Sequence, residues 1–264
     1  MTWGLPPAGP RSLKNNLFRI EARMIIHEER CVGCGRCHSC CPTGAIRYQG
    51  LKSTIDQEVC YECGTCLRCA GCPVEAIEEP PTVYDYPRAL RKFFSDPKSV
   101  HAVTGIQGRG TEESKTNDIT HRCGPGEVGV AIEVGRPTLG MSLRDVQKIT
   151  RAIARTGFHK IEPQNPIHSM IADARTGDLK PEMLEERVLS AIIEFTVKRE
   201  ELRGILRTLK EVAKEVDSVF CIDACTMLDP GLTVPAEVIE SIEAEGLTWR
   251  PNAKVNMGLG RAWE

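Results

Sequence analysis

Residues 31–42 read CVGCGRCHSCCP, and residues 60–73 read CYECGTCLRCAGCP. In each stretch three cysteines stand three residues apart, and a further cysteine precedes a proline. A loop with this spacing lets three thiolates converge on one inorganic group, while backbone N–H groups point inward and stabilise its negative charge. Gly35 and Gly64 follow the second cysteine of each copy, where a side chain would hinder so tight a turn.

The spacing of the first stretch, Cys-x2-Cys-x2-Cys-x3-Cys-Pro, is typical of iron–sulfur cluster loops. The second stretch repeats it, and each Cys-Pro is followed after two residues by Ala-Ile, at 45–46 and 76–77. Such self-similarity indicates a duplicated half-domain. Residues 25–80, roughly a fifth of the chain, resemble the bacterial two-[4Fe-4S] ferredoxin family. We expect short strands at 24–27, 45–48, 53–55 and 76–78.

The resemblance implies two [4Fe-4S] clusters with crossed ligation, in which the fourth cysteine of each copy binds the cluster of the other copy. The second copy departs from the family pattern by an insertion, Ala70 and Gly71, before its fourth cysteine. Each copy also has an extra cysteine, Cys40 or Cys69, which spacing alone leaves open as a fourth ligand or as a small buried hydrophobic residue. The proline that directly follows Cys41 and Cys72 favours these two cysteines as the fourth ligands. The implied sets are Cys31, Cys34, Cys37 with Cys72, and Cys60, Cys63, Cys66 with Cys41.

Other readings of the cysteines fit less well. Structural zinc takes four ligands from two Cys-x2-Cys pairs, whereas each copy here has three cysteines at this spacing and a Cys-Pro. Residues 1–24 contain prolines and basic residues and no apolar core, so we expect no secretory signal and no disulfide scaffold. We therefore expect a reducing, anaerobic cytoplasm. A net charge of −2 and the lack of a long apolar stretch argue against nucleic-acid binding and a membrane span.

The chain divides by composition into four parts. We expect an N-terminal extension at 1–24, a ferredoxin domain at 25–80, a helix and Gly-rich linker at 81–125, and an α+β domain with a C-terminal tail at 126–264. Apolar periodicity in the last part predicts strand–helix–strand twice over, which is a ferredoxin-like βαββαβ antiparallel sandwich, a fold name unrelated to iron and sulfur. The expected strands are 128–134, 158–161, 189–197 and 219–223, and the expected helices are 86–95, 142–157, 199–216 and 235–245.

The remaining cysteines and the Gly-rich stretch allow a second interpretation. Arg109 lies in a Gly-x-x-Gly-x-Gly run that could bind an anion or be a plain flexible loop. Cys123 follows His121 and Arg122, which would lower the pKa of an exposed thiol, but we expect an inert loop cysteine rather than a reactive one. Cys221 and Cys225 stand too far apart along a strand for a disulfide, so we expect them to pack in the core.

These patterns predict an iron–sulfur electron-transfer protein for an anaerobic redox enzyme or complex. Its partners would be redox proteins, with a basic patch facing the mildly acidic cluster segment. The C-terminal domain would serve docking, homo-oligomerisation or binding of a small-molecule ligand, and fold analogy names no ligand. The alternative is an anaerobic enzyme component that acts on a thiol or sulfur-containing substrate at the Gly105–Cys123 loop.

Overall fold

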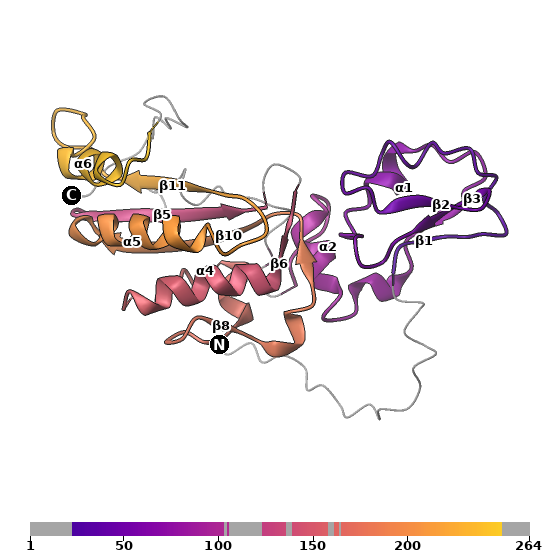
Figure 1. The fold of residues 1–264 in the computed structure, drawn as a ribbon, viewed down its shortest axis with the longest axis horizontal. Coiled ribbons are helices and arrows are strands. Elements are labelled where there is room, and N and C mark those ends of the chain that lie inside the picture. Colours follow the sequence, from indigo (N-terminus) through magenta and orange to yellow (C-terminus); the bar gives the residue numbers. More distant parts are fainter. Residues whose placement is uncertain are drawn as a thin grey trace.

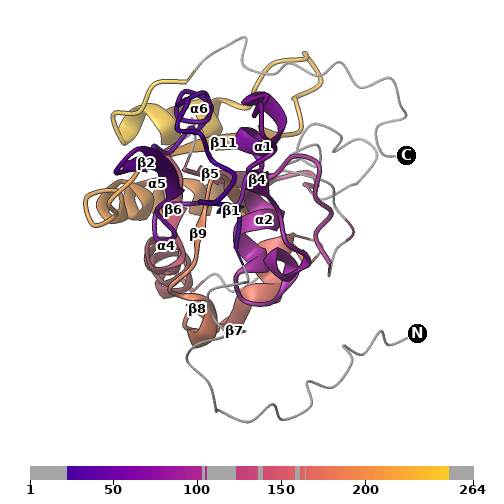
Figure 2. The ribbon, with the colours of Figure 1, turned by 90° about the vertical axis from the view of Figure 1, so that its right-hand side faces the viewer.

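The structure, a computed structural model, describes residues 23–102, 105, 123–135, 139–157, 161–163 and 165–249. It is a mixed α/β structure with several small sheets. The cysteine-rich segment, residues 25–80, lies at one end of the elongated molecule, and a larger C-terminal part, residues 123–249, lies at the other (Figure 1). Helix α2 (Ala89–Ser95) lies between them, beside β4 of the cysteine-rich segment in the turned view (Figure 2).

The cysteine-rich segment is built on two short antiparallel strand pairs at the expected positions. Strand β1 (Ile25–Ile26) pairs with β4 (Ile77–Glu78), so the beginning and end of the segment lie side by side. Strand β2 (Ile46–Gln49) pairs with β3 (Lys52–Ile55). The β1–β4 pair brings the loop that follows β1 next to the cysteine that precedes β4, which joins the two copies into one unit. Helix α1 (Thr65–Cys69) lies within the second copy.

The C-terminal part is centred on a three-stranded antiparallel sheet. Its central strand is β5 (Glu127–Val134), flanked by β10 (Ala191–Lys198) and β11 (Phe220–Thr226). Residue Ile161 makes an antiparallel bridge to Phe195 of β10, while 158–160, the rest of an expected strand, lie outside the described residues. Helices α4 (Leu143–Arg155) and α5 (Arg199–Val212) pack against each other beneath the sheet (Figure 1).

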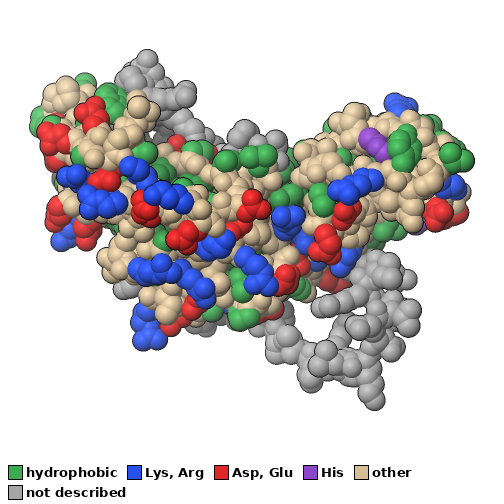
Figure 3. Space-filling model, viewed as in Figure 1, with side chains coloured by type: hydrophobic (Ala, Val, Ile, Leu, Met, Phe, Trp, Pro, Cys, Tyr) green, Lys and Arg blue, Asp and Glu red, His purple; other side chains and the backbone are tan. Residues whose placement is uncertain are grey.

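Apolar side chains at alternate positions of β5 hold this sheet against helices α4 and α5. Val128, Val130, Ile132 and Val134 are each at most 2 % exposed and join one hydrophobic core with the apolar faces of α4 and α5. Each such aliphatic side chain contributes about 1.5–3 kcal/mol by burial. The α4 helix begins as predicted, because the Ser142 hydroxyl accepts a hydrogen bond from the Asp145 N–H at 3.1 Å. The opposite faces of α4 and α5 carry intermingled acidic and basic side chains (Figure 3).

Several expectations differ from the observed elements. Helix α2 begins at Ala89, later than the expected start at 86, and α5 ends at Val212, before the expected end at 216. The core position expected for Cys221 is wrong, because β11 is an edge strand and pairs Cys221 with Glu133 on the face away from the helices, where the thiol is exposed. Cys225 is half-buried on that same face.

Short elements complete the described chain. No helix among the residues placed in the structure is both long and apolar enough to cross a membrane. The remaining elements are η2 (Pro81–Tyr84), β6 (Met141–Ser142) paired with β9 (Arg187–Val188), η4 (Pro166–Met170), β7 (Ile171–Asp173) paired with β8 (Asp178–Leu179), η5 (Pro181–Met183) and α6 (Ala236–Ala244).

The junction between the two parts includes a close aromatic contact. The Tyr61 side chain, 5 % exposed, donates from its hydroxyl to the Leu139 carbonyl at 3.3 Å. Gly140 has φ +71°, and a Cβ there would lie 2.3 Å from the Tyr61 hydroxyl oxygen. Glycine is therefore required at 140 both for its backbone conformation and for the approach of the ring. Tyr61 follows Cys60 directly, so the second cysteine loop is fixed to the sheet part.

His101 makes stability depend on pH. Its ring is 4 % exposed beside Phe93 and Phe94, and burial lowers its pKa from 6.5 to about 4. The folded chain keeps this ring neutral while the unfolded chain protonates it, so its contribution is complete above pH 6.5 and is lost as the pH falls to about 4. We expect about 3 kcal/mol of unfolding free energy to be lost over this window. Urea titrations from pH 7 to pH 4 should show a flatter slope for His101→Gln, whereas the exposed His168→Gln should retain the slope.

Candidate iron–sulfur site

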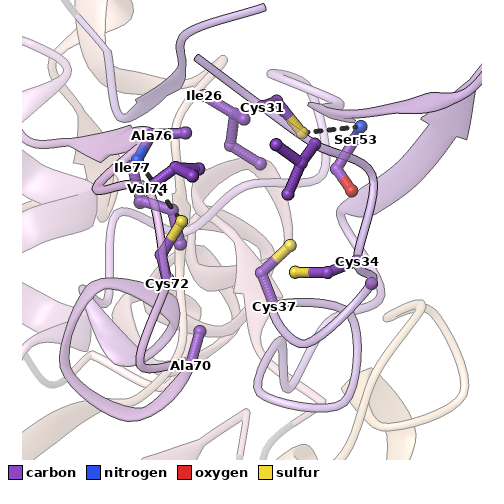
Figure 4. Close-up of a pocket in the computed structure, with 12 residues that line it drawn as sticks. Ile26, Cys31, Cys34, Cys37, Ser53, Ala70, Cys72, Val74, Ala76 and Ile77 are labelled. Carbon is purple, nitrogen blue, oxygen red and sulfur yellow. Dashed lines mark hydrogen bonds between the residues drawn. The ribbon is translucent and has the colours of Figure 1, made fainter.

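The first cysteine loop and the fourth cysteine of the second copy surround one pocket. Figure 4 shows the sulfur atoms of Cys31, Cys34, Cys37 and Cys72 around the hollow. Apolar side chains such as Ile26 complete the lining. The pairing of β1 with β4 is what brings Cys72 across to the loop that starts at Cys31.

Backbone N–H groups point at the sulfur atoms in the same way in both copies. The first cysteine of each loop accepts from the N–H two residues on, Gly33 to Cys31 and Glu62 to Cys60, each at 3.4 Å. The N–H of Ser53 also donates to Cys31, at 3.4 Å. The cysteine before each proline accepts from the N–H four residues on, at 3.2 Å for Ala45 to Cys41 and 3.3 Å for Ala76 to Cys72. Such bonds stabilise negative charge on sulfur.

The second set of cysteines is more buried than the first. Burial, together with the neighbouring thiols of Cys63 and Cys41, raises the pKa of Cys66 to about 12. Burial also raises the pKa of Cys60, and the negative charge of the Glu62 carboxylate acts in the same direction. The thiols of Cys63 and Cys41 thus lie close enough to Cys66 to act on its pKa. Binding of metal by such thiols requires that they lose their protons.

In the first set, the surroundings shift the pKa of Cys37 and the pKa of Cys31 in opposite directions. Burial raises the pKa of Cys37, and the hydrogen bond with Ser53 only partly offsets this. For Cys31, burial acts in the same direction, but the hydrogen bonds from Ser53 and Gly33 outweigh it and the pKa lies below its ordinary value. The hydrogen bonds from Ser53 and Gly33 therefore favour the thiolate form of Cys31.

The donor set fits an iron–sulfur cluster. Cysteine thiolates are soft ligands suited to such clusters, and the N–H groups described above point at their sulfur atoms. Within the described residues, no three His, Cys, Asp or Glu side chains lie close enough together to share one metal ion. Cys40 and Cys69 line no part of the pocket: the Cys40 thiol faces the Arg36 carbonyl at 3.5 Å, and Cys69 is exposed.

Buried charges from outside the cysteine-rich segment surround the second loop, and sequence analysis missed them. The Glu62 carboxylate is fully buried and accepts two hydrogen bonds from the Arg88 guanidinium, one of them at 2.8 Å from Nε. Arg91 pairs with Glu186 at 2.5 Å and is 3 % exposed. Lys92 pairs with Asp96 at 2.5 Å. The basic run Arg-Lys at 91–92 is the only sequence signal, and it resembles an ordinary solvated helix face.

The second interpretation finds no support around Cys123. Its thiol is 1 % exposed and donates to the carbonyls of Glu127 at 3.2 Å and Cys225 at 3.4 Å. Burial raises its pKa to about 11, which fits the expected inert cysteine and does not support the alternative of an exposed, reactive thiol. Arg109, His121 and Arg122 lie outside the described residues.

Comparison with known proteins places the cysteine-rich segment in a family. The family described as 4Fe-4S binding domain matches residues 24–47. The chain is 34% identical over 76 residues to the pyruvate synthase subunit PorD of Thermotoga maritima, covering 28% of this chain and 74% of that protein. It is 42% identical over 60 residues to the ferredoxin-like protein in vnf region of Azotobacter chroococcum, covering 22% of this chain and 92% of that protein.

A third relative is much longer than the matched region. This relative is a component of the ion-translocating oxidoreductase complex of Methanosarcina acetivorans, and it is 49% identical over 51 residues, but the match covers only 19% of each chain. Through its cysteine-rich segment the chain belongs to the 4Fe-4S ferredoxin family, whose members are iron–sulfur electron carriers.

Proposed function

We propose that the chain holds two [4Fe-4S] clusters and passes single electrons between a donor and an acceptor protein. Bound clusters of this type supply one-electron redox chemistry. The observation that carries the proposal is the pocket in which Cys72 of the second copy completes a set with three thiols of the first. The proposed ligand sets are Cys31, Cys34, Cys37 with Cys72, and Cys60, Cys63, Cys66 with Cys41.

We further propose that the protein is a subunit of an anaerobic redox complex in a reducing cytoplasm. The names of two relatives, a pyruvate synthase subunit and a component of an ion-translocating complex, support such an assembly. All thirteen cysteines are free thiols, which fits a reducing compartment.

The organisation into domains is a proposal of the same kind. Two separate hydrophobic cores, one around Met24 and Ile55 and one around Ile132 and Leu143, support division into a ferredoxin domain at 25–80 and an α+β sandwich at 126–264. The sandwich domain would dock a partner or a second copy, or bind a small-molecule ligand.

Metal analysis tests the proposal directly. After anaerobic reconstitution with iron and sulfide, we expect about eight irons and eight sulfides per chain, because each [4Fe-4S] cluster contributes four of each. Dithionite reduction should produce electron paramagnetic resonance (EPR) signals of two interacting clusters. About four irons per chain would contradict the presence of two clusters. Zinc in place of iron in anaerobically purified protein would contradict the proposal as a whole.

A further inference from the structure

An arginine from helix α2 reaches the backbone of the second cysteine loop. The Nη1 atom of Arg91 donates to the carbonyls of Cys60 at 2.8 Å, Gln57 at 3.1 Å and Glu58 at 3.3 Å. Its Nε atom donates to Glu186 at 2.5 Å. Because the side chain is only 3 % exposed, water screens its charge weakly. The guanidinium thus stands between a proposed ligand residue and a carboxylate of the C-terminal part.

A second arginine repeats this arrangement at the next ligand residue. The Nη2 atom of Arg68 donates to the Cys63 carbonyl at 2.7 Å, and its Nη1 atom donates to Asp96 at 3.0 Å. Both arginines therefore turn their positive group to the second loop, and each one's carboxylate partner comes from outside the segment. At the first loop, within the described part of the chain, the carbonyls of Cys31 and Cys34 accept no hydrogen bond from a lysine or arginine side chain.

The buried pair of Glu62 and Arg88 has the opposite orientation, because its carboxylate rather than its guanidinium lies nearer the second loop. The Glu62 carboxylate lies near Cys60, but the Arg88 guanidinium neutralises it through two hydrogen bonds and Met24 donates its N–H to it at 3.1 Å. Because the carboxylate is the nearer of the two charges, Glu62 acts on Cys60 more strongly than the Arg88 guanidinium does and works against the two arginines. The guanidinium groups of Arg91 and Arg68 bond directly to two carbonyls of the second loop, whereas at the first loop the Lys52 ammonium acts on Cys31 without such a bond.

Reduction adds one negative charge to a cluster, so a nearby positive group stabilises the reduced form and raises the reduction potential. We propose that Arg91 and Arg68 give the site of Cys60, Cys63, Cys66 and Cys41 a higher potential than the site of Cys31, Cys34, Cys37 and Cys72. This inference rests on the proposed function. One electron taken from an external one-electron reductant then leaves the first site oxidised and the second reduced. Electrons would thus move toward the junction with the sheet part.

Removing the charge of Arg91 and removing the charge of Glu186 should shift the midpoint potential of the second site in opposite directions. In an EPR-monitored redox titration of the reconstituted full chain, Arg91→Gln should lower the higher of the two midpoint potentials. Glu186→Gln should raise it, because it keeps the shape and leaves the guanidinium uncompensated. Arg91→Lys should stay closer to the unmodified protein than Arg91→Gln. Arg144→Gln, which breaks the exposed pair with Glu185 next in sequence to Glu186, should change neither potential.

The outcomes separate this inference from the proposed function. Iron and sulfide content is measured first on every variant, and a shortage in the unmodified protein counts against the clusters themselves. With the clusters present, shifts of the same sign in Arg91→Gln and Glu186→Gln, or no shift in either, would overturn the role of Arg91. If Arg91→Gln does not fold, the sign of the shift in Glu186→Gln decides alone.

Discussion

Replacement of Cys72 by alanine should reduce the iron content of reconstituted protein from about eight to about four atoms per chain. The reason is that Cys72 lines the pocket of the first loop, so its loss removes the fourth ligand of that cluster only. Iron and sulfide assays after anaerobic reconstitution measure the effect. The matched controls are Cys69→Ala and Cys40→Ala, which should retain about eight irons.

Double variants establish whether the ligation is crossed. If Cys72 completes the set of the first loop, adding Cys31→Ala to Cys72→Ala removes a ligand from a cluster that is already lost, and about four irons remain. Adding Cys60→Ala instead removes the other cluster, and almost no iron remains. The reverse result, with the Cys31 double variant empty and the Cys60 double variant half loaded, would show that each copy binds its own cluster.

Arg88→Met should lower the free energy of unfolding by about 3–5 kcal/mol, because it leaves the Glu62 carboxylate buried without its partner. Glu62 is fully buried and the Arg88 side chain is 10% exposed. The variant also removes the bonds of Arg88 to Gln57, one of which joins Nη1 to the carbonyl at 3.0 Å. Anaerobic urea unfolding of the reconstituted protein, followed by far-UV circular dichroism and by the visible absorption of the clusters, measures the loss.

Two further variants show whether burial of the charge is the cause. Arg144→Met breaks an ion pair in which both side chains are more than half exposed, and should cost less than about 1 kcal/mol. The double variant Arg88→Met/Glu62→Leu removes both charges and should recover most of the stability. Equal losses in Arg88→Met and Arg144→Met, or no recovery in the double variant, would contradict this account.

Local patterns in the sequence predicted the elements that depend on neighbouring residues. The short strands of the cysteine-rich segment follow the duplicated Ala-Ile positions, and β5 follows the alternation of Val128, Val130, Ile132 and Val134. The start of α4 follows from Ser142, whose hydroxyl caps the helix. In each case the signal and the structure lie within about ten residues, where periodicity and capping operate.

Features that depend on distant residues were not predictable in this way. Arg91 bonds Glu186 and the Cys60 carbonyl, 95 and 31 residues away, and no local pattern specifies such partners. The burial of Cys123 depends on a distant residue in the same way, since Cys225, whose carbonyl accepts its hydrogen bond, follows 102 residues later. The exposure of Cys221 depends on β11 being the edge strand, which is a property of the whole sheet.

The distance in sequence between Arg91 and Glu186 also has a consequence for biosynthesis. The cysteine-rich segment leaves the ribosome first, and Glu186 follows Arg91 by 95 residues. At translation rates of about 5–20 residues per second, roughly 5 to 20 s pass between the two. During this interval the second loop is not yet covered by the C-terminal part. We therefore expect iron and sulfide delivery to the nascent chain to precede closure of the junction.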